Sequence, residues 1–173
     1  MAEELTLRQL SLRFGKMAIA DKFIIRSVGK HLKNACKSYI GHERPEWPKL
    51  SPTTEIIKER MGAPLNAPLE RTGESKKDIH YKVAPSYKYV DVYSDSEGLV
   101  DSEHGTPNQP PRPLFGLAIK KEQANIEKMT GAFMMAALSG KPDGFPTLIA
   151  GDEDVKRDFL FFVNIAKSFV RMI

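Results

Sequence analysis

The stretch DKFIIRSVGKHLKNACKSYI, residues 21–40, carries the pattern on which the fold prediction rests. Its apolar residues recur with the period of an α-helix, and the same pattern extends back to about residue 4, so one amphipathic helix is predicted over residues 4–40. The predicted apolar face consists of Leu10, Phe14, Met17, Ile24, Ile25, Val28, Leu32, Ala35, Cys36 and Tyr39. A helix of this length has more apolar surface than a small domain usually covers, so we expect a sheet, a neighbouring subunit, or both to pack against it.

The basic residues of this helix lie on nearly the opposite side. The first 50 residues contain ten Lys or Arg against five Asp or Glu, which accounts for the net charge of +4 of the whole chain. Two interpretations remain open: a solvated helix face, or a surface that contacts phosphates or an acidic partner. The second makes a nucleic-acid-binding module the alternative function. The residues concerned are Lys22, Arg26, Lys30, Lys33 and Lys37.

Shorter elements follow this helix. Ser51 is a suitable N-cap and Pro52 a suitable first residue for a short helix that ends near Met61. Alternating patterns predict strands over residues 79–83 and 87–93, with Leu99-Val100 as a candidate third strand inside a polar loop over residues 94–113. A second long helix is predicted over residues 117–138, with a buried side formed by Ile119, Ile126, Met129, Phe133, Met134 and Ala137. The predicted fold class is therefore α+β: an antiparallel sheet of three to five strands packed against the two long helices.

The C-terminal region has its own pattern. We expect an α+β domain over residues 1–139, followed by a linker and an amphipathic helix over residues 140–173. Apolar residues of this last helix follow a spacing of four and three. They can dock on the chain's own core or be buried against another copy, and the pattern leaves both open. These residues are Val155, Phe159, Phe162, Ala166 and Phe169.

Motifs for catalysis are missing from the sequence. It contains no phosphate-binding P-loop, no G-x-G-x-x-G, no G-x-S-x-G and no H-E-x-x-H. The four histidines lie far apart, and the single cysteine, Cys36, fits a small core residue. An enzyme would need Asp101, Glu103 and His104 to act together, although adjacent residues rarely converge on one substrate atom. We therefore predict a protein without enzymatic activity, metal or cofactor, and without a segment of the roughly 20 apolar residues that span a bilayer.

Two stretches of the sequence resemble a known family. The first is WPKLSPTT at residues 47–54, followed by LERTG at residues 69–73. The second is EHGT at residues 103–106, followed by PPRPLFG at residues 110–116. In order and spacing they resemble the virion-morphogenesis and tail-completion proteins of tailed phages, over roughly residues 5–135. Two departures are Glu74-Ser75, where the family usually has an apolar residue, and Leu114-Phe115, which shifts the usual Pro-Phe by one position.

The resemblance implies a structural protein of the head–tail neck or the tail terminus. Such a head–tail connector or tail-completion protein would form a ring, a hexamer or a dodecamer, and would assemble in the host cytoplasm into the virion. Its partners would be itself, head-completion or connector proteins, and tail-tube or tail-terminator proteins, with DNA passing through the lumen. We expect the subunit interface among Glu103, His104, Gly105, Thr106, Pro111, Arg112, Pro113, Phe115, Phe159, Phe162 and Phe169. For Arg112, packing within its own subunit is the open alternative.

Overall fold

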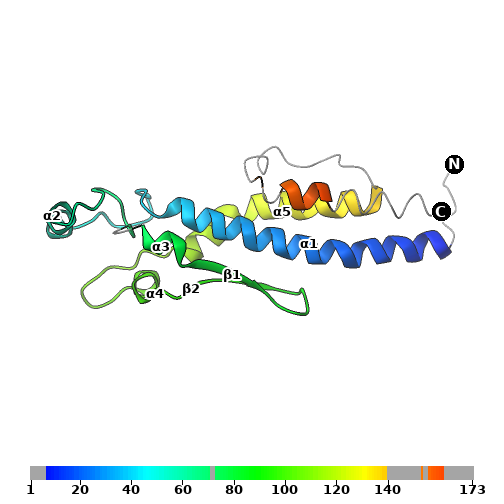
Figure 1. Ribbon diagram of the computed structural model, residues 1–173, viewed down its shortest axis with the longest axis horizontal. Helices are drawn as coiled ribbons and strands as arrows, with labels where there is room; N and C mark the ends of the chain where they lie inside the picture. The colour runs from blue at the N-terminus through cyan, green and yellow to red at the C-terminus, as the bar shows by residue number, and fades with distance from the viewer. Residues whose placement is uncertain (1–6, 71–72, 140–152, 154–155, 162–173) are drawn as a thin grey trace. The chain divides into compact units, whose positions relative to one another are not determined.

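The computed structural model describes residues 7–70, 73–139, 153 and 156–161, and for residues 7–19 and 138–139 it describes the backbone alone. The predicted α+β class is confirmed, because two antiparallel strands pack against helices (Figure 1). The elements divide into two compact units. Unit 1 contains residues 1–31, 83–90 and 123–173, and unit 2 contains residues 32–82 and 91–122.

The first long helix, α1, spans Leu7–Tyr39 and contributes to both units, which confirms the helix predicted over residues 4–40. Five of its predicted core residues are buried, and Ile25 and Val28 are half-buried. The side chains of Leu10, Phe14 and Met17 lie outside the described residues. Gly41 ends the helix with a φ of 86°, and its N–H donates to Pro68 O at 2.9 Å. The five buried residues are Ile24, Leu32, Ala35, Cys36 and Tyr39.

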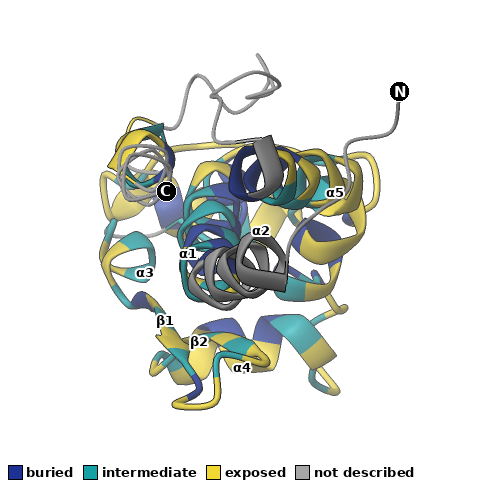
Figure 2. Cartoon of the chain, turned by 90° about the vertical axis from the view of Figure 1, so that its right-hand side faces the viewer, coloured by how far each residue is buried: buried dark blue, intermediate teal, exposed yellow. Residues whose placement is uncertain are grey.

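The core of unit 1 forms between α1 and the second half of helix α5, Phe115–Ser139. Figure 2 shows buried positions where these two helices face each other. Alanines at four of these positions allow the helix backbones to approach closely. Phe159 packs into the same core, with its ring centroid 5.1 Å from that of Phe133. The alanines are Ala20, Ala132, Ala136 and Ala137.

The position of Phe159 answers one question left open by the sequence. Its ring is 1% exposed, and its neighbour Asp158 accepts from Lys30 Nζ at 2.6 Å, so this part of the C-terminal region docks on the chain's own core. Val155, Phe162, Ala166 and Phe169 lie outside the described residues. The predicted division into residues 1–139 and 140–173 stays a prediction.

Unit 2 is built from short elements around a second core. These elements are α2, Pro52–Arg60; α3, Glu74–Lys77; β1, Ile79–Val83; β2, Val90–Ser94; and α4, Glu97–His104, with the two strand ends nearest the turn belonging to unit 1. The core consists of Cys36, Tyr39, Ile40, Trp47, Ile79, Leu99, Leu114, Leu117 and Ala118. The predicted N-cap is confirmed, because Ser51 Oγ accepts from Thr54 N at 3.1 Å.

Three details of the prediction are wrong. The described residues form one sheet of two strands, not three to five, and β2 starts at Val90 because residues 84–89 form a turn in which Tyr87 has a φ of 55°. Leu99 and Val100 lie in α4 rather than in a strand. The helix buries Leu99 and Ser102, which lie one turn apart on the same side, and this spacing fits a helix and not a strand. Ile119 is 57% exposed, because the start of α5 buries Leu117 and Ala118 instead.

Phe159→Ala tests the docking of the C-terminal region. Removing a buried ring from the contact with Phe133 should lower the free energy of unfolding by about 3 kcal/mol or more. Phe161→Ala is the matched control, since Phe161 is 60% exposed and should cost about 1 kcal/mol or less. Urea denaturation followed by circular dichroism measures both, and equal losses would contradict the docking of Phe159 on this core.

Candidate functional site

The two stretches that carry the family resemblance meet in unit 2. Trp47 Nε1 donates to Pro113 O at 3.0 Å, and Arg112 donates from Nε to Pro48 O and from Nη2 to Lys49 O, both at 3.1 Å. Trp47 is 5% exposed and Arg112 is 6% exposed. We call these contacts the Trp–Arg junction. Arg112 thus packs within its own subunit, the alternative that the sequence left open.

The charged side chain of Arg112 is bound by neutral groups alone in the part of the chain that the structure describes. Its guanidinium binds main-chain carbonyl oxygens, and among the described residues no carboxylate lies within ion-pair distance. Burial lowers the pKa of this side chain, although arginine keeps its proton under all ordinary conditions. A buried cation without a counter-ion is costly, so an acidic group brought to its open side would be stabilised.

Glu103 holds the first turn of α5. Its carboxylate accepts from Leu114 N at 2.6 Å, from Phe115 N at 2.9 Å and from Gly116 N at 3.0 Å. These N–H groups have no partner inside the helix, and the helix dipole favours a negative charge beside them. Glu103 therefore acts as a helix cap from a distant segment. Its neighbour His104 is exposed, and in the part of unit 2 that the structure describes no hydrogen bond joins it to Glu103.

The segment between Glu103 and α5 folds back on itself. Gly105 N donates to Asp101 O at 2.7 Å, Arg112 N donates to Ser102 O at 2.6 Å, and Thr106 and Gln109 form an antiparallel bridge. Gly105 has a φ of 79° and a ψ of 166°, a conformation that is open essentially to glycine alone. A Cβ there would also lie 3.0 Å from Cδ and N of Pro111.

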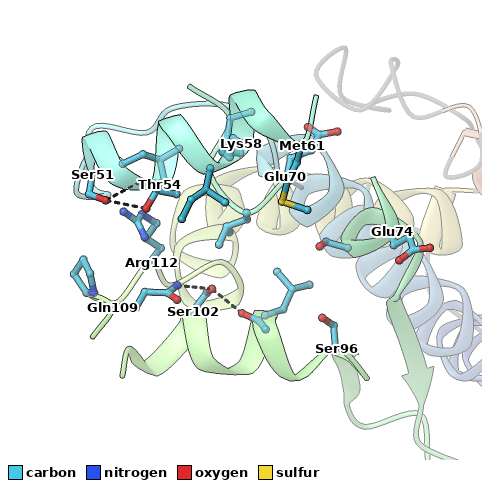
Figure 3. Close-up of a pocket in the computed structure, with 18 of the residues that line it drawn as sticks. Ser51, Thr54, Lys58, Met61, Glu70, Glu74, Ser96, Ser102, Gln109 and Arg112 are labelled. Atoms are coloured by element: carbon cyan, nitrogen blue, oxygen red, sulfur yellow. Dashed lines mark hydrogen bonds between the residues drawn. The ribbon is translucent and has the colours of Figure 1, made fainter. Parts of the chain in front are cut away.

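A pocket of about 680 Å³ lies beside the Trp–Arg junction, between α2 and α4 (Figure 3). Ser51, Thr54 and Arg112 lie at one end of it, and Glu70 and Glu74 lie at the other. Apolar side chains also line the pocket, among them Leu50, Ile57, Met61, Leu69 and Leu99.

Helix α2, which lines this pocket, buries a charged side chain and exposes apolar ones. Lys58 is its buried residue, 7% exposed, and its amine donates to Ala67 O at 2.6 Å. Desolvation lowers the pKa of Lys58, while Glu55 and Glu70 act in the opposite direction. Ile56 and Ile57 of the same helix are 49% and 50% exposed. The apolar residues of α2 therefore face outward, which its sequence alone does not suggest.

The basic face of α1 is partly engaged within the chain. Lys22 Nζ lies 5.6 Å from the ring centre of Tyr87, and Lys33 Nζ lies 5.5 Å from that of Tyr81. Lys30 pairs with Asp158. Sequence reasoning missed both tyrosines, although their place in the alternating hairpin pattern was visible. The remaining two residues differ in exposure: Arg26 is exposed and Lys37 is half-buried.

The other interface candidates are spread over several environments. His104 and Pro111 are exposed, Thr106 and Pro113 are half-buried, and Phe115 packs at the edge of the unit 2 core. Phe159 is buried in unit 1. Phe162 and Phe169 lie outside the described residues.

Comparisons with known proteins give no assignment. No family model matches the chain, and neither a curated protein nor a solved structure is significantly similar to it. In the part of the chain that the structure describes, no helix has the length and hydropathy needed to cross a bilayer. In the same residues, no group of three or more His, Cys, Asp or Glu side chains could hold a metal ion.

Glu103→Gln tests the cap on α5. Losing the charge beside the helix N-terminus should lower the free energy of unfolding by about 1 kcal/mol, because charge-assisted hydrogen bonds become neutral ones. Asp101→Asn changes an exposed residue of α4, the helix that carries Glu103, and should alter the free energy of unfolding by less than about 0.5 kcal/mol. Chemical denaturation at neutral pH measures both values, and a Glu103→Gln protein as stable as wild type would exclude the cap as a stabilising contact.

Gly105→Ala tests the fold-back of the segment after α4. Backbone strain and the close approach of Pro111 should together cost about 3 kcal/mol. Gly62→Ala is the control, since Gly62 also has a positive φ, 65°, but nothing lies within 4 Å of its added Cβ. It should cost only about 1 kcal/mol. Thermal unfolding of the two variants distinguishes them, and equal losses would mean that Pro111 does not constrain this position.

Proposed function

We propose that this chain is a structural assembly protein of a tailed phage, which completes the tail or joins it to the head as part of a ring of identical subunits. Its partners would be copies of itself, head-completion or connector proteins, and tail-tube or tail-terminator proteins. Its place would be the neck or tail of the virion. The motif resemblance of residues 47–54, 69–73 and 103–116 supports this proposal.

The chemistry of the motif residues also supports it. Trp47, Glu103 and Arg112 each bind main-chain groups of their own subunit, so their polar atoms hold the architecture of unit 2 together. A catalytic role would require such groups to face a reactant. We infer that these motifs maintain a rigid module whose function lies on its surface.

The observation that carries the proposal is the apolar surface around α2. Four of its large apolar side chains are about half exposed, although the adjacent Lys58 is buried. Large exposed apolar patches mark sites of protein–protein contact, and we propose that these side chains form such a patch. Coverage by other subunits would remove these apolar side chains from water in the assembled protein. The four residues are Ile56, Ile57, Met61 and Leu65.

The nucleic-acid-binding alternative has weaker support. Three of the five basic residues on the predicted face of α1 contact a tyrosine ring or an aspartate of the same chain. Neutralising phosphates would require these contacts to break, which reduces the favourable free energy of binding. DNA in the lumen of a ring remains compatible with the proposed function, with Arg26 as the exposed cation of this face.

A stop codon in the gene for this chain, within the phage genome, tests the proposed function. We expect lysates that contain heads and tails that are unjoined or incompletely finished, visible by negative-stain electron microscopy, and a loss of infectious particles. A plasmid copy of the wild-type gene should restore infectivity. Normal particles from the mutant phage, without this protein in them, would refute the proposed function.

A further inference from the structure

The helix α4 presents two different faces within unit 2. Leu99 and Ser102 are buried and line the pocket beside α2. The residues on the opposite side, at 100° per residue, are all exposed. Val100 is 48% exposed on this outer face, which also carries two acidic side chains. The outer face of α4 consists of Glu97, Val100, Asp101 and His104.

The pocket on the inner side of α4 has apolar and charged side chains that can complement those of the outer face. Its wall toward α2 contains Ile57 and Met61, each 50% exposed, so an apolar side chain from outside can be buried there. Arg112 lies at one end without a carboxylate partner among the described residues, and Lys49 lines the pocket as well. At the opposite end of the pocket lie Glu70 and Glu74 (Figure 3).

We propose that the outer face of α4 from one copy of this chain docks into the pocket between α2 and α4 of a second copy. Val100 would pack against Ile57 and Met61. The acidic residues Glu97 and Asp101 would lie toward Lys49 and Arg112, and His104 would lie toward Glu70 and Glu74.

Charge complementarity selects a second copy as the occupant. The outer face of α4 has acids followed by a histidine. In the pocket, Arg112 lies at one end and Glu70 and Glu74 lie at the other, where Glu70 also pairs with Lys76 Nζ at 3.0 Å. A carboxylate from outside would give the buried Arg112 the counter-ion that unit 2 does not supply. The desolvation that lowers the pKa of Arg112 agrees with this need for a counter-ion.

The placement of the two surfaces determines the symmetry of the contact. Because they lie on opposite faces of α4, one two-fold contact cannot bring each copy's outer face into the other's pocket. The interface is therefore heterologous, and each copy keeps one free pocket and one free outer face. Such contacts propagate and close into a ring when the rotation allows it. This inference rests on the proposed function, for which it names the contact surfaces.

The test uses one variant on each surface, each with a matched control. Ile57→Asp puts a carboxylate on the apolar wall of the pocket, whereas Ile119→Asp makes the same change at an exposed position on α5 that does not line the pocket. Val100→Lys puts a cation on the outer face of α4, and Ile119→Lys makes the same change at an exposed position on α5. Circular dichroism verifies that all four variants are folded.

Sedimentation velocity over a concentration series measures the assembly of the full chain. We expect Ile57→Asp and Val100→Lys each to weaken self-association at least about tenfold, and both controls to assemble like wild type. An equimolar mixture of Ile57→Asp and Val100→Lys should form a dimer and nothing larger. This dimer is expected because the first variant keeps an intact outer face and the second keeps an intact pocket.

Three results would overturn the inference: a wild-type chain that stays monomeric throughout the series, variants that assemble like wild type, or a mixture that stays monomeric. None of them decides the proposed function, which the stop-codon experiment tests separately. A protein that is required for particle assembly, but whose association is insensitive to Ile57→Asp and Val100→Lys, keeps the proposed function and loses only this interface.

Discussion

The hydrogen bonds from Arg112 to the carbonyl oxygens of Pro48 and Lys49 are the contact on which the rest of unit 2 depends. They join segments 63 and 64 residues apart along the chain. With Trp47 held on Pro113 O, they determine where the proline-rich segment ends and therefore where α5 begins. The Glu103 carboxylate can cap α5 only because these contacts place the first N–H groups of α5 next to it.

This arrangement explains how a costly group persists in the core. A guanidinium bound only to carbonyl oxygens retains part of its desolvation cost, but removing it would take away the donor that each of these oxygens has within unit 2. The planar fork of arginine reaches two carbonyls of successive residues at once, which an ammonium group cannot do with the same geometry. Arg112 therefore aligns the loop and also leaves a positive end in the adjacent pocket.

The inverted burial of α2 follows from the same architecture. Lys58 turns inward because its amine finds Ala67 O, and the isoleucines beside it consequently face outward. In an isolated subunit this leaves apolar surface in contact with water, which costs free energy of solvation. Coverage by a second copy would recover that free energy, so the surface that the fold leaves exposed is the one through which we propose assembly.

The sequence by itself determined the α+β class, helix α1, the cap at Ser51 and strand β1, since these depend on local periodicity and capping. Only the tertiary structure decided that Glu103 caps α5 and that Arg112 turns inward. It also decided that Leu99 lies in a helix and that Ile119 is exposed. These outcomes depend on contacts between residues that are separated in the sequence, because packing of the whole chain determines burial and hydrogen-bond partners. Local sequence patterns do not encode which of these residues meet.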